Sequence, residues 1–204
     1  VLALEAGVVP PSLIPPDTRH SLVANEGLAN RSQNVFSEIT EDRREITRRY
    51  QAEMQRLAKA SLESVPSNEA AAQVSGREVF EKNCSQCHRL GGIGQDVGPP
   101  LGQLQQKTPQ QLLEAILDPN REIDPKYTAY RILLSDGRAL SGIVQQETAG
   151  QFILAEPGGR VYAINRSEVD VLSSTGQSIM PVGLEQAITP EQMADLIDYL
   201  RTAN

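Results

Sequence analysis

The sequence predicts a mainly α-helical fold that contains a small antiparallel β insertion and follows an N-terminal helical segment. Three observations support this prediction: helix-start signals in the C-terminal part of the chain, short β-favouring runs between the last two of those signals, and one apolar helical stripe nearer the N-terminus. The 204 residues are 39% hydrophobic, which is enough for a buried core. Only 4% are aromatic, so aliphatic side chains must form most of that core.

Charge and composition exclude several classes of protein. A net charge of −7 leaves no basic surface that could neutralise many phosphates, so we expect no nucleic-acid partner. No stretch approaches the roughly 18 unbroken apolar residues of a membrane span, so we expect no integral membrane segment. Two cysteines cannot form a disulfide framework in a chain of this length. The composition therefore predicts a soluble, acidic globular protein.

The N-terminal zone, residues 1–62, is polar and is predicted to be helical. Its apolar side chains fall near one helical stripe, and such a helix has to pack on something else. The stripe consists of Ile39, Ile46, Tyr50, Met54 and Leu57. Residues 63–74 are predicted to form a linker to a second zone, which consists of residues 75–204. The chain begins at Val1 without the features of a signal peptide, and we expect a fragment or a processed product.

Three capping boxes mark the helices of the second zone. Each has a hydroxyl N-cap with Glu or Gln three residues later, and two also have Pro at the first helical position. With N-caps at Ser75, Thr108 and Thr189, they predict helices near 76–88, 109–117 and 190–202. Between the last two, at about 126–173, short β-favouring runs are separated by Asp136-Gly137 and Gly158-Gly159, which are hairpin signals. We therefore expect a small antiparallel sheet there.

The strongest chemical signal is the segment Cys84-Ser-Gln-Cys87-His88. Two cysteines at this spacing, followed directly by His, match the c-type haem attachment motif. The thiols bond to the vinyl groups on one edge of the porphyrin, and the adjacent imidazole becomes an axial ligand of the iron. The sequence therefore predicts one haem c, attached covalently through Cys84 and Cys87, with His88 on the iron.

Other interpretations of these cysteines fit less well. A structural zinc site needs four ligands, and outside the motif only His20 is a good nitrogen donor. A thioredoxin-type pair begins a helix after a strand, whereas this pair is predicted to end one. A buried pair of inert cysteines would not need His88.

The second axial ligand decides what the haem can do. An open position binds small molecules or supports peroxide chemistry, whereas a second protein ligand favours electron transfer. Met180 lies in a loop stiffened by Pro181 and Gly183, directly before the last predicted helix. Met54 and Met193 lie on helix stripes, where packing explains them. We expect Met180 as the second ligand, and the alternative is that it only fills a loop.

The stretch from Gly76 to Leu90, followed by Val97-Gly-Pro-Pro-Leu101, resembles class I cytochrome c. The resemblance implies that the Gly and the aromatic residue of the first helix pack on the last helix, here Gly76 and Phe80 on Leu196 and Tyr199. It also implies that the carbonyl of Pro99 bonds to the ligating imidazole, which orients the ring and raises its basicity. Leu101 is expected to help exclude water from the haem.

Residues 75–202 are more closely similar to the planctomycete-type haem-binding domain. The shared features are Leu117-Asp-Pro-Asn120, Tyr127-Thr-Ala-Tyr130, the Asp136-Gly137 hairpin and a Ser-x-Met-Pro-x-Gly-Leu loop. In that family the methionine of this loop ligates the iron, which implies Met180. The domain there often follows a dehydrogenase-like β-propeller and a HEAT-like helical segment, and residues 1–62 resemble the tail of that segment.

Together these features predict a single-haem electron carrier that is not itself an enzyme. The resemblance implies a redox partner protein or an upstream dehydrogenase domain, and a periplasmic or otherwise exported location, because covalent haem attachment occurs outside the cytoplasm. The competing hypothesis is a haem sensor or a peroxidase-like enzyme with an open or displaceable second ligand. A third is that the β insertion is an interaction module.

Overall fold

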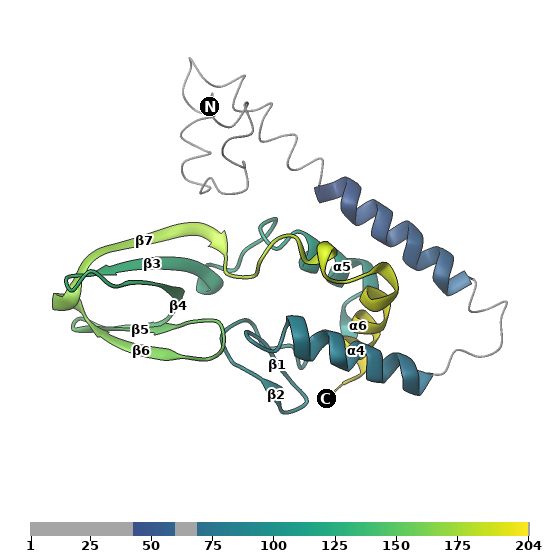
Figure 1. Cartoon of the computed structure of the whole chain (residues 1–204), viewed down its shortest axis with the longest axis horizontal. Helices are drawn as coiled ribbons and strands as arrows, with labels where there is room; N and C mark the ends of the chain where they lie inside the picture. Colours follow the sequence, from purple (N-terminus) through teal and green to yellow (C-terminus); the bar gives the residue numbers. More distant parts are fainter. Residues whose placement is uncertain (1–42, 60–68, 204) are drawn as a thin grey trace, which may run out of the picture.

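The computed structural model describes residues 43–59 and 69–203. Within that part, helices gather at one end of the molecule and a five-stranded sheet forms the other end (Figure 1). A helix over 43–59 comes first. The remaining elements are α4 (Glu69–Asn83), β1 (Arg89–Leu90), β2 (Ile93–Gly94), α5 (Pro109–Leu117), β3 (Thr128–Leu134), β4 (Ala139–Glu147), β5 (Gln151–Ala155), β6 (Val161–Asn165), β7 (Val169–Ser178) and α6 (Pro190–Thr202), with a short 3₁₀ helix, η5 (Leu184–Gln186), before α6.

The prediction of a mainly α-helical fold is wrong, because the β structure is far more than a small insertion. Its five strands pair antiparallel in the order β6-β5-β4-β3-β7. The sheet has a hydrophobic core of its own, made by Ile132, Leu134, Phe152, Leu154 and Ile164. A sheet with its own buried face is an independent layer, and helices gathered at one end of an antiparallel sheet make an α+β fold.

The sheet also extends further along the chain than the predicted insertion. Strand β7 continues to Ser178, where it pairs with Thr128 of β3, whereas the sequence predicted an end near residue 173. Residues 173–178 are mostly polar and carry no alternating apolar pattern, so only pairing with β3 makes them a strand. Both hairpin signals are confirmed: Gly137 joins β3 to β4, and Gly158 and Gly159 join β5 to β6, all three with positive φ.

The helical end has a core in which α4 crosses α6 at close range. A Cβ atom at Gly76 would lie 2.2 Å from the backbone oxygen of Asp195 and 2.7 Å from Cβ of Tyr199. The rings of Phe80 and Tyr199 have centroids 5.9 Å apart. The expected contact between the first and last helices is therefore present, and it depends on the absence of a side chain at Gly76.

Two of the three predicted helix starts are confirmed. Thr108 and Thr189 each form a complete capping box, with Pro in the first turn of α5 and α6. The predicted start at Ser75 is wrong, because α4 begins at Glu69 and Ser75 lies inside it. Residues 69–74, predicted as linker, contain three consecutive alanines, the strongest helix formers, and extend the helix backwards. The helix also ends at Asn83, earlier than the predicted 88.

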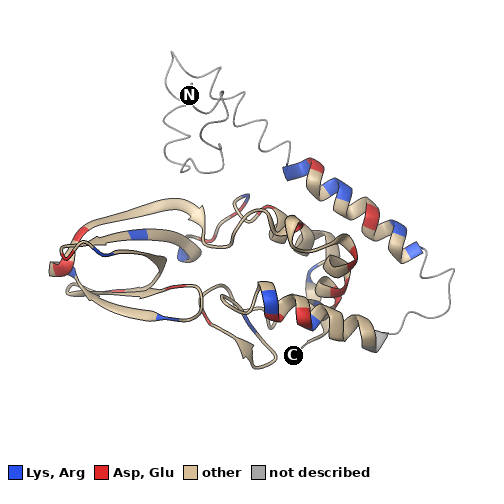
Figure 2. Cartoon of the chain, in the orientation of Figure 1, with Lys and Arg blue, Asp and Glu red and all other residues tan. Residues whose placement is uncertain are grey.

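The helix over 43–59 packs against this helical core, as its stripe predicted. Ile46, Tyr50 and Met54 are partly buried against it. Ile39 and His20 lie outside the described residues. Figure 2 shows many charged residues along the helices, whereas the strands of the large sheet carry few. No helix in the described ranges is long and apolar enough to cross a membrane.

Candidate haem site

The two cysteines lie on a tight turn that directly follows α4. The backbone N–H of Cys84 still donates to the carbonyl of Phe80 (2.8 Å), which continues the helical pattern by one residue. The N–H groups of Cys87 and His88 then both donate to the carbonyl of Cys84 (3.0 and 2.9 Å). This turn holds both thiols and the imidazole on one short rigid segment, as attachment along one porphyrin edge requires.

The imidazole of His88 is held by the loop that follows β2. Its Nδ1 donates to the carbonyl of Pro99 at 2.9 Å, so the hydrogen bond implied by the resemblance is present. Because a carbonyl can only accept, Nδ1 carries the proton and the neutral ring keeps its lone pair on Nε2. A ring oriented in this way is typical of a metal-ligating histidine.

Gly98 allows the loop to approach the ring this closely. A Cβ atom there would lie 2.6 Å from Cε1 of His88 and 2.9 Å from Nδ1. The N–H groups of Val97 and Gly98 both donate to the carbonyl of Cys87 (3.0 and 2.6 Å), which ties the loop to the attachment turn. The sequence contained Gly98 beside Pro99, but only the structure shows that its missing side chain makes room for the imidazole.

Burial favours the neutral forms of the two thiols and of the imidazole. It raises the pKa of the Cys84 thiol to about 12, and the neighbouring Cys87 adds to this effect. It also raises the pKa of Cys87. For His88, burial lowers the pKa, although the hydrogen bond to Pro99 acts in the opposite direction. A neutral imidazole is the form that binds metal, so His88 suits the role of an axial ligand of a c-type haem.

The large sheet contacts the attachment turn directly. The N–H of Gly158, in the β5–β6 hairpin, donates to the carbonyl of Gln86 between the two cysteines (2.7 Å). The side chain of Gln145 on β4 donates to the carbonyl of Asp96 (2.8 Å). Nothing in the sequence indicated these contacts, because they join residues more than 45 positions apart.

Met180 lies in a loop just beyond β7 and is half-buried. Its N–H donates to Oγ of Ser178 (3.1 Å), and the N–H of Ser178 donates to Oδ1 of Asn120 (2.9 Å). The preceding residue, Ile179, packs against the hydrophobic cluster that also receives Cys87. The buried members of this cluster are Val97, Ile143 and Ala155. The methionine loop and the attachment turn therefore share one apolar cluster.

Three further candidates from the sequence lie in or against the helical core. Met193 is fully buried in the helical core, and Met54 and Leu101 pack against the same core. Ser178 and Asn120 hold the Met180 loop, although the sequence analysis assigned neither residue a role of its own. The sequence analysis did single out the segment Leu117-Asp-Pro-Asn120. Nothing in the sequence indicated that Asn120 accepts a hydrogen bond from Ser178 at the end of β7.

Residues 73–132 match the family model of cytochrome c. The match includes the attachment turn, His88, Pro99 and Leu101 and reaches into β3. This part of the chain is therefore a c-type haem-binding domain, with haem c attached covalently through Cys84 and Cys87. Such a domain transfers electrons through its haem and exchanges them with a redox partner. Comparison with curated proteins gives no match.

Proposed function

We propose that the chain is a single-haem electron carrier whose iron is ligated by His88 and Met180. The observation that carries this proposal is the shared cluster: Ile179, next to Met180, and Cys87, next to His88, both pack against the cluster of three buried residues. The loop that would provide the second ligand thus lies on the cluster that supports the turn providing the first.

Each residue has a distinct task in this function. The haem supplies one-electron exchange at an iron whose ligands stay in place. Cys84 and Cys87 would attach one edge of the porphyrin to the chain. The carbonyl of Pro99 accepts a hydrogen bond from Nδ1 of His88, which makes the imidazole a stronger base. A methionine thioether opposite histidine raises the reduction potential. Leu101 would help exclude water from the haem surroundings.

The partner is proposed to be a separate redox protein or an upstream dehydrogenase domain. The chain carries a net charge of −7, which favours a partner with a basic docking patch.

The periplasmic or otherwise exported location also stays a proposal. Expression with and without an export signal tests it: covalent haem should appear in the exported protein only.

Absorption spectra of the haem-loaded full chain test the ligand set. We expect a low-spin spectrum with a methionine–iron charge-transfer band at the red end of the ferric spectrum. Met180→Ala should abolish this band. Met193→Leu is the matched control, because it removes a thioether from the buried face of α6 and should leave the band intact.

Two outcomes would overturn the proposal. A high-spin wild-type spectrum with rapid binding of carbon monoxide would indicate an open position and the sensor or peroxidase-like hypothesis. A band that survives Met180→Ala would mean that another residue is the ligand.

A further inference from the structure

We propose that Arg43 and Tyr50, on the helix over 43–59, are positioning residues that hold Met180 in place through the segment that follows it. The inference rests on the proposed ligation by Met180. It concerns a helix that lies outside the residues matched by the cytochrome c family and far from Met180 along the chain.

The contacts between this helix and the segment after Met180 are specific. The hydroxyl of Tyr50 lies 2.8 Å from the carbonyl oxygen of Glu185 and 2.6 Å from that of Ile188. Its single proton is shared in a hydrogen bond to these two carbonyls. The guanidinium of Arg43 forms an ion pair with the carboxylate of Glu185 at 2.9 Å. Both charged side chains are mostly buried, at 16% and 11% exposed, so this pair is screened far less than a surface pair.

The segment that receives these contacts is short and begins four residues after Met180. Residues 184–186 form η5, and the N–H groups of Ala187 and Ile188 both donate to the carbonyl of Leu184 (3.0 Å each). Ile188 is fully buried, and Thr189 then caps α6. This compact turn connects the methionine loop to the last helix.

The Met180 loop is consequently held at both ends. At its start, the N–H of Ser178 donates a hydrogen bond to the side chain of Asn120. At its end, η5 is held by Arg43 and Tyr50. Between the two anchors, Pro181 restricts the backbone and Gly183 has a φ of 94°. The loop between Ser178 and Leu184 is short and held at both ends, so Met180 has little freedom to move away from the iron. Loss of one of these anchors would restore that freedom.

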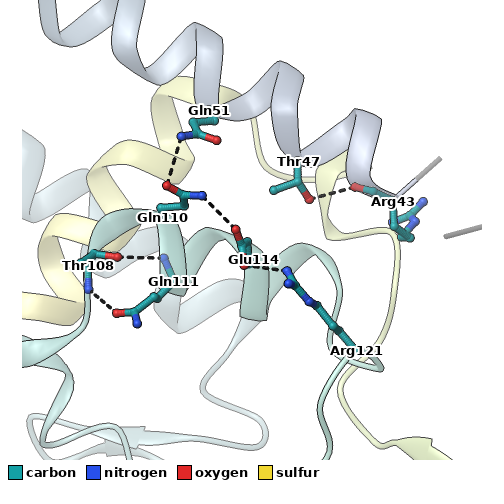
Figure 3. Close-up of polar contacts among 8 residues, drawn as sticks. All are labelled: Arg43, Thr47, Gln51, Thr108, Gln110, Gln111, Glu114 and Arg121. Atoms are coloured by element: carbon teal, nitrogen blue, oxygen red, sulfur yellow. Dashed lines mark hydrogen bonds and ion pairs between the residues drawn. The ribbon is translucent and has the colours of Figure 1, made fainter. Parts of the chain in front are cut away.

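The helix that carries Arg43 and Tyr50 is itself anchored. Ile46, Tyr50 and Met54 pack against the helical core. On the side facing α5, Gln51 donates to Gln110 (3.3 Å), as Figure 3 shows. Gln110 donates in turn to Glu114 of α5 (3.0 Å), and Arg121, which lies beyond the end of α5, donates to the same carboxylate (2.7 Å). The helix can therefore act as a fixed support for η5.

The test uses Tyr50→Phe in the haem-loaded full chain, because this change removes only the hydroxyl. Carbon monoxide binds the reduced iron only after Met180 leaves, so its binding rate reports release of the ligand. We expect the rate to rise about tenfold, the factor that corresponds to the loss of one partly buried hydrogen bond. Glu185→Gln, which removes the charge of the ion pair, should raise it as well.

The matched control is Tyr162→Phe, which removes another hydrogen bond made by a tyrosine hydroxyl: Tyr162, on β6, donates to the carboxylate of Glu156 just after β5 (3.0 Å). It should leave the binding rate unchanged. Hydrogen exchange of the N–H groups of Gln186, Ala187 and Ile188 gives a readout that is independent of the haem. This exchange should accelerate in Tyr50→Phe and not in Tyr162→Phe.

The outcomes separate the two proposals. If wild type lacks the methionine–iron band, the proposed ligation fails before any variant is compared. If wild type has the band but Tyr50→Phe and Tyr162→Phe have the same binding rate, the positioning role is overturned. A loss of global stability in Tyr50→Phe at an unchanged binding rate also overturns it, because that is the result of a merely structural contact.

Discussion

Gly76→Ala tests whether the close crossing of α4 and α6 holds the helical end together. The new Cβ would lie 2.2 Å from the carbonyl oxygen of Asp195, which is backbone and cannot rotate away. The helices must therefore separate, which also loosens the contact of Phe80 with Tyr199. Overpacking costs about 1–3 kcal/mol, with this contact at the upper end, and the gain of helix propensity from Gly to Ala returns up to about 1 kcal/mol.

The net expectation is a destabilisation of about 2 kcal/mol, or a fall of about 4–8 °C in Tm for a chain of this size. Urea unfolding of the haem-loaded chain, followed by circular dichroism, measures the change. Gly102→Ala is the control, because a Cβ atom there meets nothing within 4 Å. An unfolding free energy for Gly76→Ala equal to or above that of wild type would refute the inferred crossing.

Two further predictions concern the loops around the site. Gly98→Ala should push the His88 ring away from Pro99, because the new Cβ would lie 2.6 Å from the ring; we expect a changed low-spin spectrum and a shifted potential in redox titration, with Gly102→Ala unchanged. Burial, followed by the charge of Glu185, raises the pKa of Tyr50 above its ordinary value of 10.0. The folded state therefore resists ionisation, so the contribution of Tyr50 to stability is intact below pH 10.0 and is lost as the pH rises above it. The difference in unfolding free energy between wild type and Tyr50→Phe should shrink over that range, and a constant difference would contradict the assignment.

Features written in consecutive residues could be predicted from the sequence. The attachment turn needs only the spacing of Cys84, Cys87 and His88, and the capping boxes at Thr108 and Thr189 need only a hydroxyl and a glutamine three residues apart. The start of α4 was missed because Ser75 completes the same pattern inside a longer helix. A local pattern identifies a possible cap, but the helix formers before it decide whether the chain uses it.

The extent of the sheet, and the contacts that hold the attachment turn in place, were harder to predict, because they depend on residues far apart in the chain. Strand β7 continues to Ser178 only because Thr128 pairs with it. The bond from Gly158 to Gln86 links the sheet to the attachment turn, and no periodicity in either segment marks it. The size of the β structure, and with it the fold class, follows from such pairings and not from local propensity.

The two sides of the haem site differ in the same way. His88 is fixed by Pro99 and Gly98, which lie within 11 residues of it and inside the part matched by the cytochrome c family. The loop of Met180, the proposed second ligand, is fixed by Asn120 and by Tyr50, residues 60 and 130 positions away. The histidine side is therefore set by local sequence, whereas the methionine side depends on how the helix over 43–59 and α5 pack on the core. Substitutions in that helix should change the hold on Met180 without disturbing His88, so the proposed second ligand can be tuned separately from His88.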